Sequence, residues 1–254
     1  MGWRSQLEFQ WEGMNELFLC ATDQGVSALM LSLARELVRH HEDVRVVCVE
    51  GVLPRTLGDL NRVLSLPKHG RPTHFDTGAV ARELEGTPWV ERVLEAQRAY
   101  HEYVGAQVDD ADLYVQCHTY APISVKVSPE QSTLDVLSDA YKCMRQHPKR
   151  PNMQLMTAPH DARRHRLCDD ALIDGVLSSY RAQGVRIKEN APFALHPLTR
   201  LSHYVRRAGG GGFGVEWNRM AVAHMFDPFG AMSFPSQRVK QWVAPMVSAL
   251  VEAA

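Results

Sequence analysis

Residues 16–50 decide the fold class; they read ELFLCATDQGVSALMLSLARELVRHHEDVRVVCVE. The apolar run 16–21 is short enough for a buried strand, and the valine-rich run 44–50 predicts a second one. Between them, apolar residues recur every three or four positions, as in an amphipathic helix. Strand, helix and strand in this order predict a βαβ unit, which implies parallel strands.

The same alternation continues toward the C-terminus. We expect further strands at 112–117, 153–158, 185–190 and 213–217, and helices at 88–108, 129–146, 169–184 and 236–252. Neither a repeat nor a linker interrupts the chain. The sequence therefore predicts one α/β domain over residues 1–254, with a mixed, mainly parallel sheet flanked by helices and residues 1–15 as a flexible arm. Four polar turns, at 22–25, 118–120, 159–161 and 216–219, are expected at the carboxyl ends of strands, where α/β folds carry function.

Composition narrows the class of protein. The 28 Lys and Arg residues nearly balance the 29 Asp and Glu residues, so no basic field favours nucleic acid or a membrane surface. The five cysteines include no C-x-x-C pair, which argues against a disulfide framework or a zinc finger. Because we find no apolar leader and no membrane-length apolar run, we expect a cytoplasmic protein.

A loop after the second expected strand holds two arginines, an asparagine and an aspartate: Arg55, Asp59, Asn61 and Arg62. Arginine presents a planar fork that binds a carboxylate through two hydrogen bonds, and asparagine adds a neutral donor. The loop therefore predicts a carboxylate-binding corner and a small anionic substrate. The alternative is a solvated loop with local ion pairs.

Four segments carry a resemblance to a known group. The motif R-x-x-x-D-L-N-R at 55–62 resembles the signature of the zinc-dependent amidohydrolases that include N-formylglutamate amidohydrolases, aspartoacylase and succinylglutamate desuccinylase. LYVQCHT at 113–119, NAPF at 190–193 and GVEWNR at 214–219 follow in the order that this group shows. The resemblance implies a zinc carboxypeptidase-like (phosphorylase/hydrolase-like) fold and hydrolysis of an N-acyl, formyl-type amino acid.

The resemblance also implies roles for individual residues. His118 and Asp23 would bind one zinc ion, and Glu216 would be the general base toward a metal-activated water. Arg55 would polarise the scissile carbonyl or hold a second carboxylate. The substrate would be bound by Asn61, Arg62, Asn190 and Arg219.

The first expected strand departs from the group, because Cys20–Gly25 reads CATDQG and contains no histidine. Asp23 is the natural substitute, and His160, Asp161 or Cys20 is a candidate third ligand. Two alternatives follow. The chain could be a metal-free, catalytically degenerate member that binds a ligand or a partner, or it could be a metallocarboxypeptidase.

Overall fold

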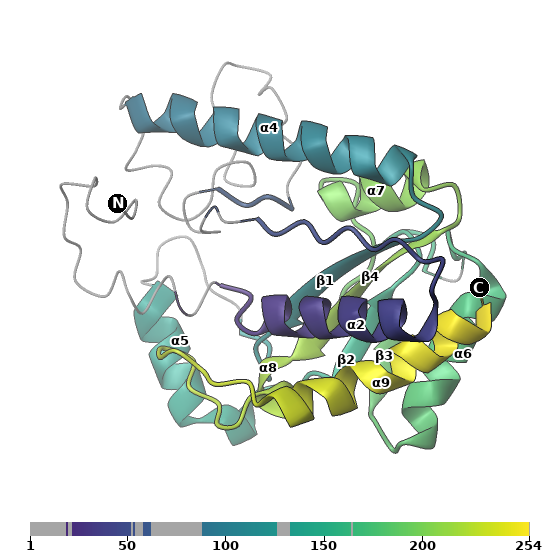
Figure 1. Cartoon of the computed structure of the whole chain (residues 1–254). Helices are drawn as coiled ribbons and strands as arrows, with labels where there is room; N and C mark the ends of the chain where they lie inside the picture. Colours follow the sequence, from purple (N-terminus) through teal and green to yellow (C-terminus); the bar gives the residue numbers. More distant parts are fainter. Residues whose placement is uncertain are drawn as a thin grey trace.

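The computed structural model of the chain describes residues 19, 22–51, 53, 58–61, 88–125, 133–163 and 165–253. Within these residues, four strands form one sheet in the order β1-β4-β2-β3 (Figure 1). The strands are β1 (Tyr114–Tyr120), β2 (Met153–Met156), β3 (Ile187–Glu189) and β4 (Gly212–Asn218). β1 is parallel to β4 and β2 is parallel to β3, whereas β2 and β4 are antiparallel. The predicted mixed, mainly parallel sheet flanked by helices is confirmed.

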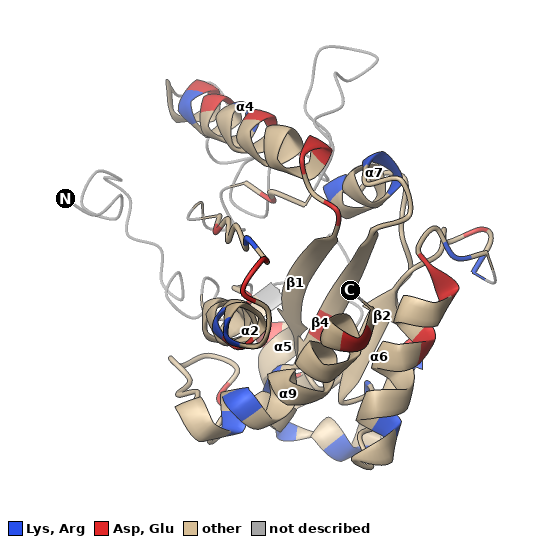
Figure 2. Cartoon of the chain, turned by 45° about the vertical axis from the view of Figure 1, so that its right-hand side comes forward, with Lys and Arg blue, Asp and Glu red and all other residues tan. Residues whose placement is uncertain are grey.

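Helices cover both faces of the sheet. α2, α6 and α9 pack together on one side, and α4 and α7 pack together on the other (Figure 1). The bounds are α2 (Val26–His40), α4 (Pro88–Asp109), α5 (Thr133–Lys142), α6 (Asp170–Ala182), α7 (Arg200–Arg207), α8 (Arg219–Val222) and α9 (Ser236–Ala253), with a 3₁₀ turn at Met144–Gln146. Basic residues mark α7 and acidic residues mark the start of α6 (Figure 2). No helix among the described residues has the length and apolar character needed to cross a bilayer.

β4 separates the apolar core from the polar face of the sheet. Phe213, Val215 and Trp217 are fully buried in the main core, which also holds residues of α2, α6 and α9. Alternate residues of a strand point to opposite faces. Gly214 lies against Leu201 of α7, so Glu216 belongs to the face that α7 covers. The same strand thus supplies core residues on one side and a carboxylate on the other.

The βαβ prediction for residues 16–50 is wrong in its second strand. The helix is present as α2, but residues 44–50 form no strand, and Val47 is 44% exposed. A valine-rich run becomes a strand only when a neighbouring strand pairs with it, and none of the described residues does so. The expected strand at 16–21, apart from Leu19, lies outside the described residues, as does the predicted arm at 1–15.

The direction of β2 corrects a second expectation. Residues 118–120 belong to β1 and residues 216–218 to β4, so the turns expected at these positions are the last residues of strands instead. Because β2 runs antiparallel to β4, residues 159–161 lie at the opposite end of the sheet from them. His160 packs there against His196, with ring centroids 5.8 Å apart. His160 and Asp161 therefore do not join His118 as the expected cluster of strand ends.

Candidate functional site

Three polar side chains form a row across the sheet. His118 of β1 is the register partner of Glu216 in β4, and Glu216 is the register partner of Gln154 in β2. Paired residues on adjacent strands point to the same face, so the three side chains share the face that α7 covers. Gln154 Nε2 donates to Glu216 Oε2 at 2.9 Å, and Gln154 Oε1 accepts from the backbone N–H of Phe193 at 3.2 Å. The sheet itself therefore brings the two predicted residues His118 and Glu216 together.

His118 is held at both ring nitrogens. Its Nδ1 lies 2.7 Å from Asp23 Oδ2, and its Nε2 lies 2.7 Å from Gln116 Nε2. Gln116 Oε1 accepts from the Tyr114 hydroxyl at 2.7 Å, which turns the amide nitrogen of Gln116 toward the imidazole. An amide nitrogen can only donate, so His118 Nε2 accepts and Nδ1 carries the hydrogen that Asp23 receives. The Asp23 carboxylate therefore orients the imidazole of His118.

The turn that carries Asp23 is fixed from several sides. Gly25 has a φ of 86°, which is the left-handed region that glycine tolerates best. The Thr119 hydroxyl donates to the Gln24 carbonyl at 3.0 Å, and Arg219 Nη1 donates to the Thr22 carbonyl at 3.3 Å. Arg219, a predicted substrate-binding residue, is buried, and this hydrogen bond joins it to the turn that places Asp23.

Arg150 packs against two aromatic residues that border the His118–Glu216 row, although no motif in the sequence indicates it. It lies just before β2, and the antiparallel pairing of β2 with β4 carries it to the end of β4 where Asn218 lies. Its guanidinium packs over the rings of Tyr120 and Phe193. Burial lowers the pKa of Arg150, and the nearby Glu216 carboxylate opposes that shift. Burial, followed by the Glu216 charge, raises the pKa of Tyr120.

A cavity of about 1010 Å³ lies beside the His118–Asp23 pair. Asp23, Gln116 and His118 contribute polar groups to its wall, together with Asp59 and Asn61 of the expected carboxylate-binding corner. Most of the other lining residues are apolar and come from α2, residues 44–49, the second half of α4 and β1. The cavity is large enough for a small organic ligand.

The other members of the predicted corner are placed only in part. Arg55 and Arg62 lie outside the described residues. Asn61 Oδ1 accepts from the backbone N–H of Leu201 at 3.0 Å, and the Asn61 carbonyl accepts from that of Arg200 at 2.9 Å. Asn61 therefore caps the start of α7, and its carboxylate-binding role stays a prediction.

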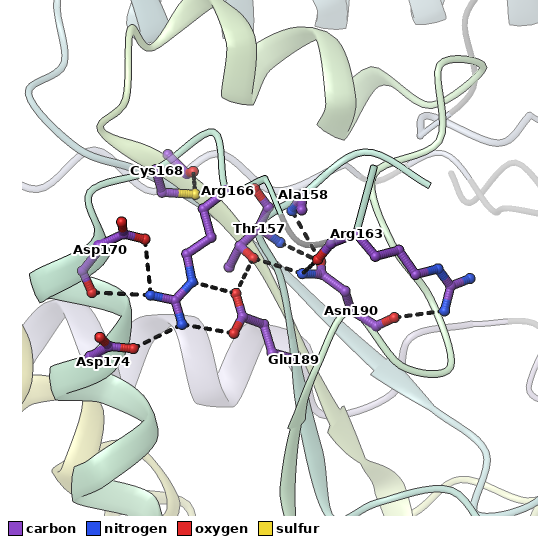
Figure 3. Close-up of polar contacts among 10 residues, drawn as sticks. Thr157, Ala158, Arg163, Arg166, Cys168, Asp170, Asp174, Glu189 and Asn190 are labelled. Carbon is purple, nitrogen blue, oxygen red and sulfur yellow. Dashed lines mark hydrogen bonds and ion pairs between the residues drawn. The ribbon is translucent and has the colours of Figure 1, made fainter. Parts of the chain in front are cut away.

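Asn190, the other predicted substrate-binding residue, holds a loop in place (Figure 3). Its Oδ1 accepts from the backbone N–H groups of Thr157 at 2.9 Å and Ala158 at 3.1 Å. Its Nδ2 donates to the Thr157 hydroxyl and to the Arg163 carbonyl. Asn190 is buried, has a φ of 52° and directly follows β3, so its amide ties the end of β3 to the segment that follows β2. A contact of Asn190 with substrate stays a prediction.

Around His118, the described residues do not complete the ligand set of a catalytic zinc. Such a site uses three protein ligands and an open position. The described residues contain no group of three His, Cys, Asp or Glu side chains that could hold a metal ion. Asp23 accepts the Nδ1 hydrogen of His118, which is how a carboxylate orients a histidine rather than how it shares a metal with one. Cys20, the remaining candidate ligand, lies outside the described residues.

Two solved structures are similar to this chain. N-formylglutamate amidohydrolase from Ralstonia eutropha JMP134 is 14% identical with a TM-score of 0.49, over 94% of this chain and 84% of that one. A gene product from Agrobacterium tumefaciens is 13% identical with a TM-score of 0.47, over 92% and 79% of the two chains. No family model matches the chain, and no curated protein matches it. The first structure belongs to the group that the sequence motifs resemble.

Proposed function

We propose that the chain hydrolyses the amide bond of a small N-acylated amino acid. The observation that carries this proposal is the register pairing of His118 with Glu216 on one face, with Asp23 hydrogen-bonded to His118. A carboxylate beside an oriented histidine supplies a proton acceptor and a polar group within reach of one bound substrate. The cavity beside His118 and Asp23 offers room for that substrate.

In the proposed reaction, Glu216 takes a proton from a water molecule as the water oxygen attacks the amide carbonyl carbon. A carbon–oxygen bond forms, and the carbonyl electron pair moves onto its oxygen. The electron pair on that oxygen then re-forms the carbonyl as the carbon–nitrogen bond breaks, and the proton passes from Glu216 to the leaving nitrogen. Gln154 donates to one Glu216 oxygen at 2.9 Å, which orients the carboxylate for this proton transfer.

Zinc remains a prediction of the sequence resemblance, and the steps above do not depend on it. Measuring the zinc content of the purified protein tests this prediction directly. Zinc bound near one ion per chain, and lost in His118→Ala, would supply the water-activating charge that the resemblance implies.

The decisive experiment measures hydrolysis of N-formyl, N-acetyl and N-succinyl amino acids beside short peptides, with and without added zinc. We expect turnover of at least one small amide, and a loss of about 100-fold or more in kcat/KM for Glu216→Gln. Glu252→Gln, which changes an exposed glutamate of α9, is the matched control and should leave the rate unchanged. An active Glu216→Gln enzyme would refute the role of Glu216, and preferential cleavage of peptides would favour the carboxypeptidase alternative.

A second candidate function is a ligand-binding protein without catalysis. The incomplete metal-ligand set among the described residues favours it. Binding of N-acyl amino acids without turnover of any of them, at any zinc concentration, would support this candidate over the hydrolase.

A further inference from the structure

Arg150 is held by contacts that occupy only part of its guanidinium. Its Cζ lies 5.4 Å from the centroid of the Tyr120 ring and 5.0 Å from that of Phe193. Its Nε donates to the Ser124 hydroxyl at 3.1 Å. Within the described part of the chain, the two terminal nitrogens of Arg150 donate no hydrogen bond to the protein. The side chain is thus fixed in orientation while its fork of donors stays available.

The backbone around Arg150 is equally well fixed. The Arg150 N–H donates to the Pro122 carbonyl at 2.9 Å, and the Ser124 N–H donates to the Pro148 carbonyl at 3.0 Å. Lys149 and Ile123 form a β-bridge beside it. A guanidinium on such a support loses little freedom when it binds a ligand, because its rotamer is already selected.

The position of Arg150 relates it to the reacting groups. Tyr120 lies two residues after His118 on the same face of β1, and Phe193 is tied through Gln154 to Glu216. The guanidinium is therefore supported by the two aromatic residues that border the His118–Glu216 row. The charge of Glu216 is also close enough to raise the pKa of Arg150, against the lowering by burial.

We propose that Arg150 is a carboxylate-binding residue of this site, which receives a carboxylate of the ligand in its two terminal nitrogens. The inference deepens the proposed function, because it assigns the binding of a charged group on the substrate to a residue outside the expected 55–62 corner. A carboxylate matches the spacing of the arginine fork and can accept two parallel hydrogen bonds. The flanking rings keep the guanidinium plane in one orientation. A carboxamide has one acceptor oxygen and no charge, so it matches the two donors of the fork less well than a carboxylate does.

The test compares ligands that differ only in this charge. N-acetylglycine and N-acetyl-L-leucine are titrated into the full chain by calorimetry, alongside their C-terminal amides, and the same pairs serve as substrates. We expect the wild-type chain to prefer each acid over its amide, and Arg150→Met to reduce that preference by about 10- to 100-fold. Arg145→Met, at an exposed arginine of the neighbouring 3₁₀ turn, is the matched control and should retain the preference.

The outcomes separate this inference from the hydrolase proposal. If the acids bind but are never hydrolysed, loss of the preference in Arg150→Met still supports the inference while the hydrolase proposal fails. If hydrolysis occurs and Arg150→Met keeps the full preference, the inference is overturned and the hydrolase proposal stands. Failure of the wild-type chain to bind either acid more tightly than its amide also overturns the inference.

Arg150→Lys keeps the experiment decisive if the methionine variant is poorly folded. Lysine retains the charge but lacks the planar fork. We expect Arg150→Lys to keep the melting temperature near that of the wild type and to show an intermediate preference for the acids. A lysine variant that is folded and has the full wild-type preference would contradict binding by the fork.

Discussion

Replacing Arg166 with methionine removes the cation from a network of three carboxylates (Figure 3). Arg166 donates to Glu189 through Nε at 2.7 Å and through Nη2 at 2.8 Å, and it also pairs with Asp170 and Asp174. The two aspartates are largely exposed, so their pairs with Arg166 contribute little. The bidentate pair is more protected, because the Arg166 and Glu189 side chains are 18% and 20% exposed.

The expected cost of Arg166→Met is about 2 kcal/mol of unfolding free energy at about pH 7, because two charge-assisted hydrogen bonds are lost under partial solvent screening. The cost should depend on pH. Burial raises the pKa of Glu189, but the hydrogen bonds from Arg166 and Thr157 outweigh it, so the net pKa is lowered. A carboxylate with a lowered folded-state pKa stabilises the fold above its unfolded pKa, and this stabilisation is lost as pH falls through the folded value. The difference between wild type and variant should therefore shrink below about pH 4.

Urea unfolding of the wild type, Arg166→Met, Glu189→Gln and the double variant measures this difference at about pH 7 and about pH 3.5. We expect a coupling of about 2 kcal/mol between the two residues at the higher pH and less at the lower pH. Lys142→Met is the control, because Lys142 and Asp139 form an exposed pair that should contribute less than about 0.5 kcal/mol. A coupling that is independent of pH, or close to zero, would refute the reasoning.

Three further changes test the scaffold. Gly25→Ala should lower the unfolding free energy by at least about 2 kcal/mol and lower activity, because φ is 86° and a β-carbon would collide with the Phe234 ring. Gly184→Ala is the control: φ is 71° there but the space is open, so melting experiments should show a cost of only about 1 kcal/mol. Burial, followed by the charge of Arg200, lowers the pKa of His101 to about 4, so folding keeps it neutral and acidification must favour unfolding. The unfolding free energy should fall by up to about 3 kcal/mol between about pH 6.5 and 4, and His101→Gln should flatten that dependence in urea titrations. Asp169→Ala should cost about 1 kcal/mol by loss of the cap of α6, and an unchanged melting temperature would contradict this contribution.

The sequence predicts the helices and strands whose apolar spacing matches their burial. α4, α6 and α9 follow their expected ranges closely, and α2 lies between the apolar runs 16–21 and 44–50 as expected, because each of these helices has a long apolar stripe. α7 was not expected, because its eight residues include only Leu201, Tyr204 and Val205 as apolar positions; packing of these three buried side chains, and the Thr199 cap, form this helix. The spacing of apolar residues does not indicate the direction in which a strand runs, so the antiparallel placement of β2 could not be predicted.

Some residues of the site could likewise be predicted from the sequence, and others depend on tertiary structure. His118 and Glu216 could be found because short motifs at the ends of expected strands mark them, and the sheet register brings them side by side. Asn61 and Asn190 were expected to face substrate, yet their side chains satisfy backbone groups of Leu201 and of Thr157, contacts that depend on tertiary structure. Arg150 could not be found, because only the reversed direction of β2 places it near Glu216.

The tyrosine at the start of β1 has a consequence for the chemistry of a residue that it does not touch. Burial raises the pKa of Tyr114 well above its ordinary value, so its hydroxyl keeps its hydrogen at neutral pH. The Tyr114 hydroxyl donates to Gln116 Oε1, and the Gln116 amide nitrogen donates to His118 Nε2. The hydrogen on His118 Nδ1 is then directed at Asp23 Oδ2. The four residues form a chain of hydrogen bonds in which Tyr114, through Gln116, favours the same tautomer of His118 as Asp23 does. In a Tyr114→Phe chain the Gln116 amide would be free to rotate, and the tautomer would depend on Asp23 alone, which nitrogen NMR of the imidazole would show as a changed population of the two tautomers.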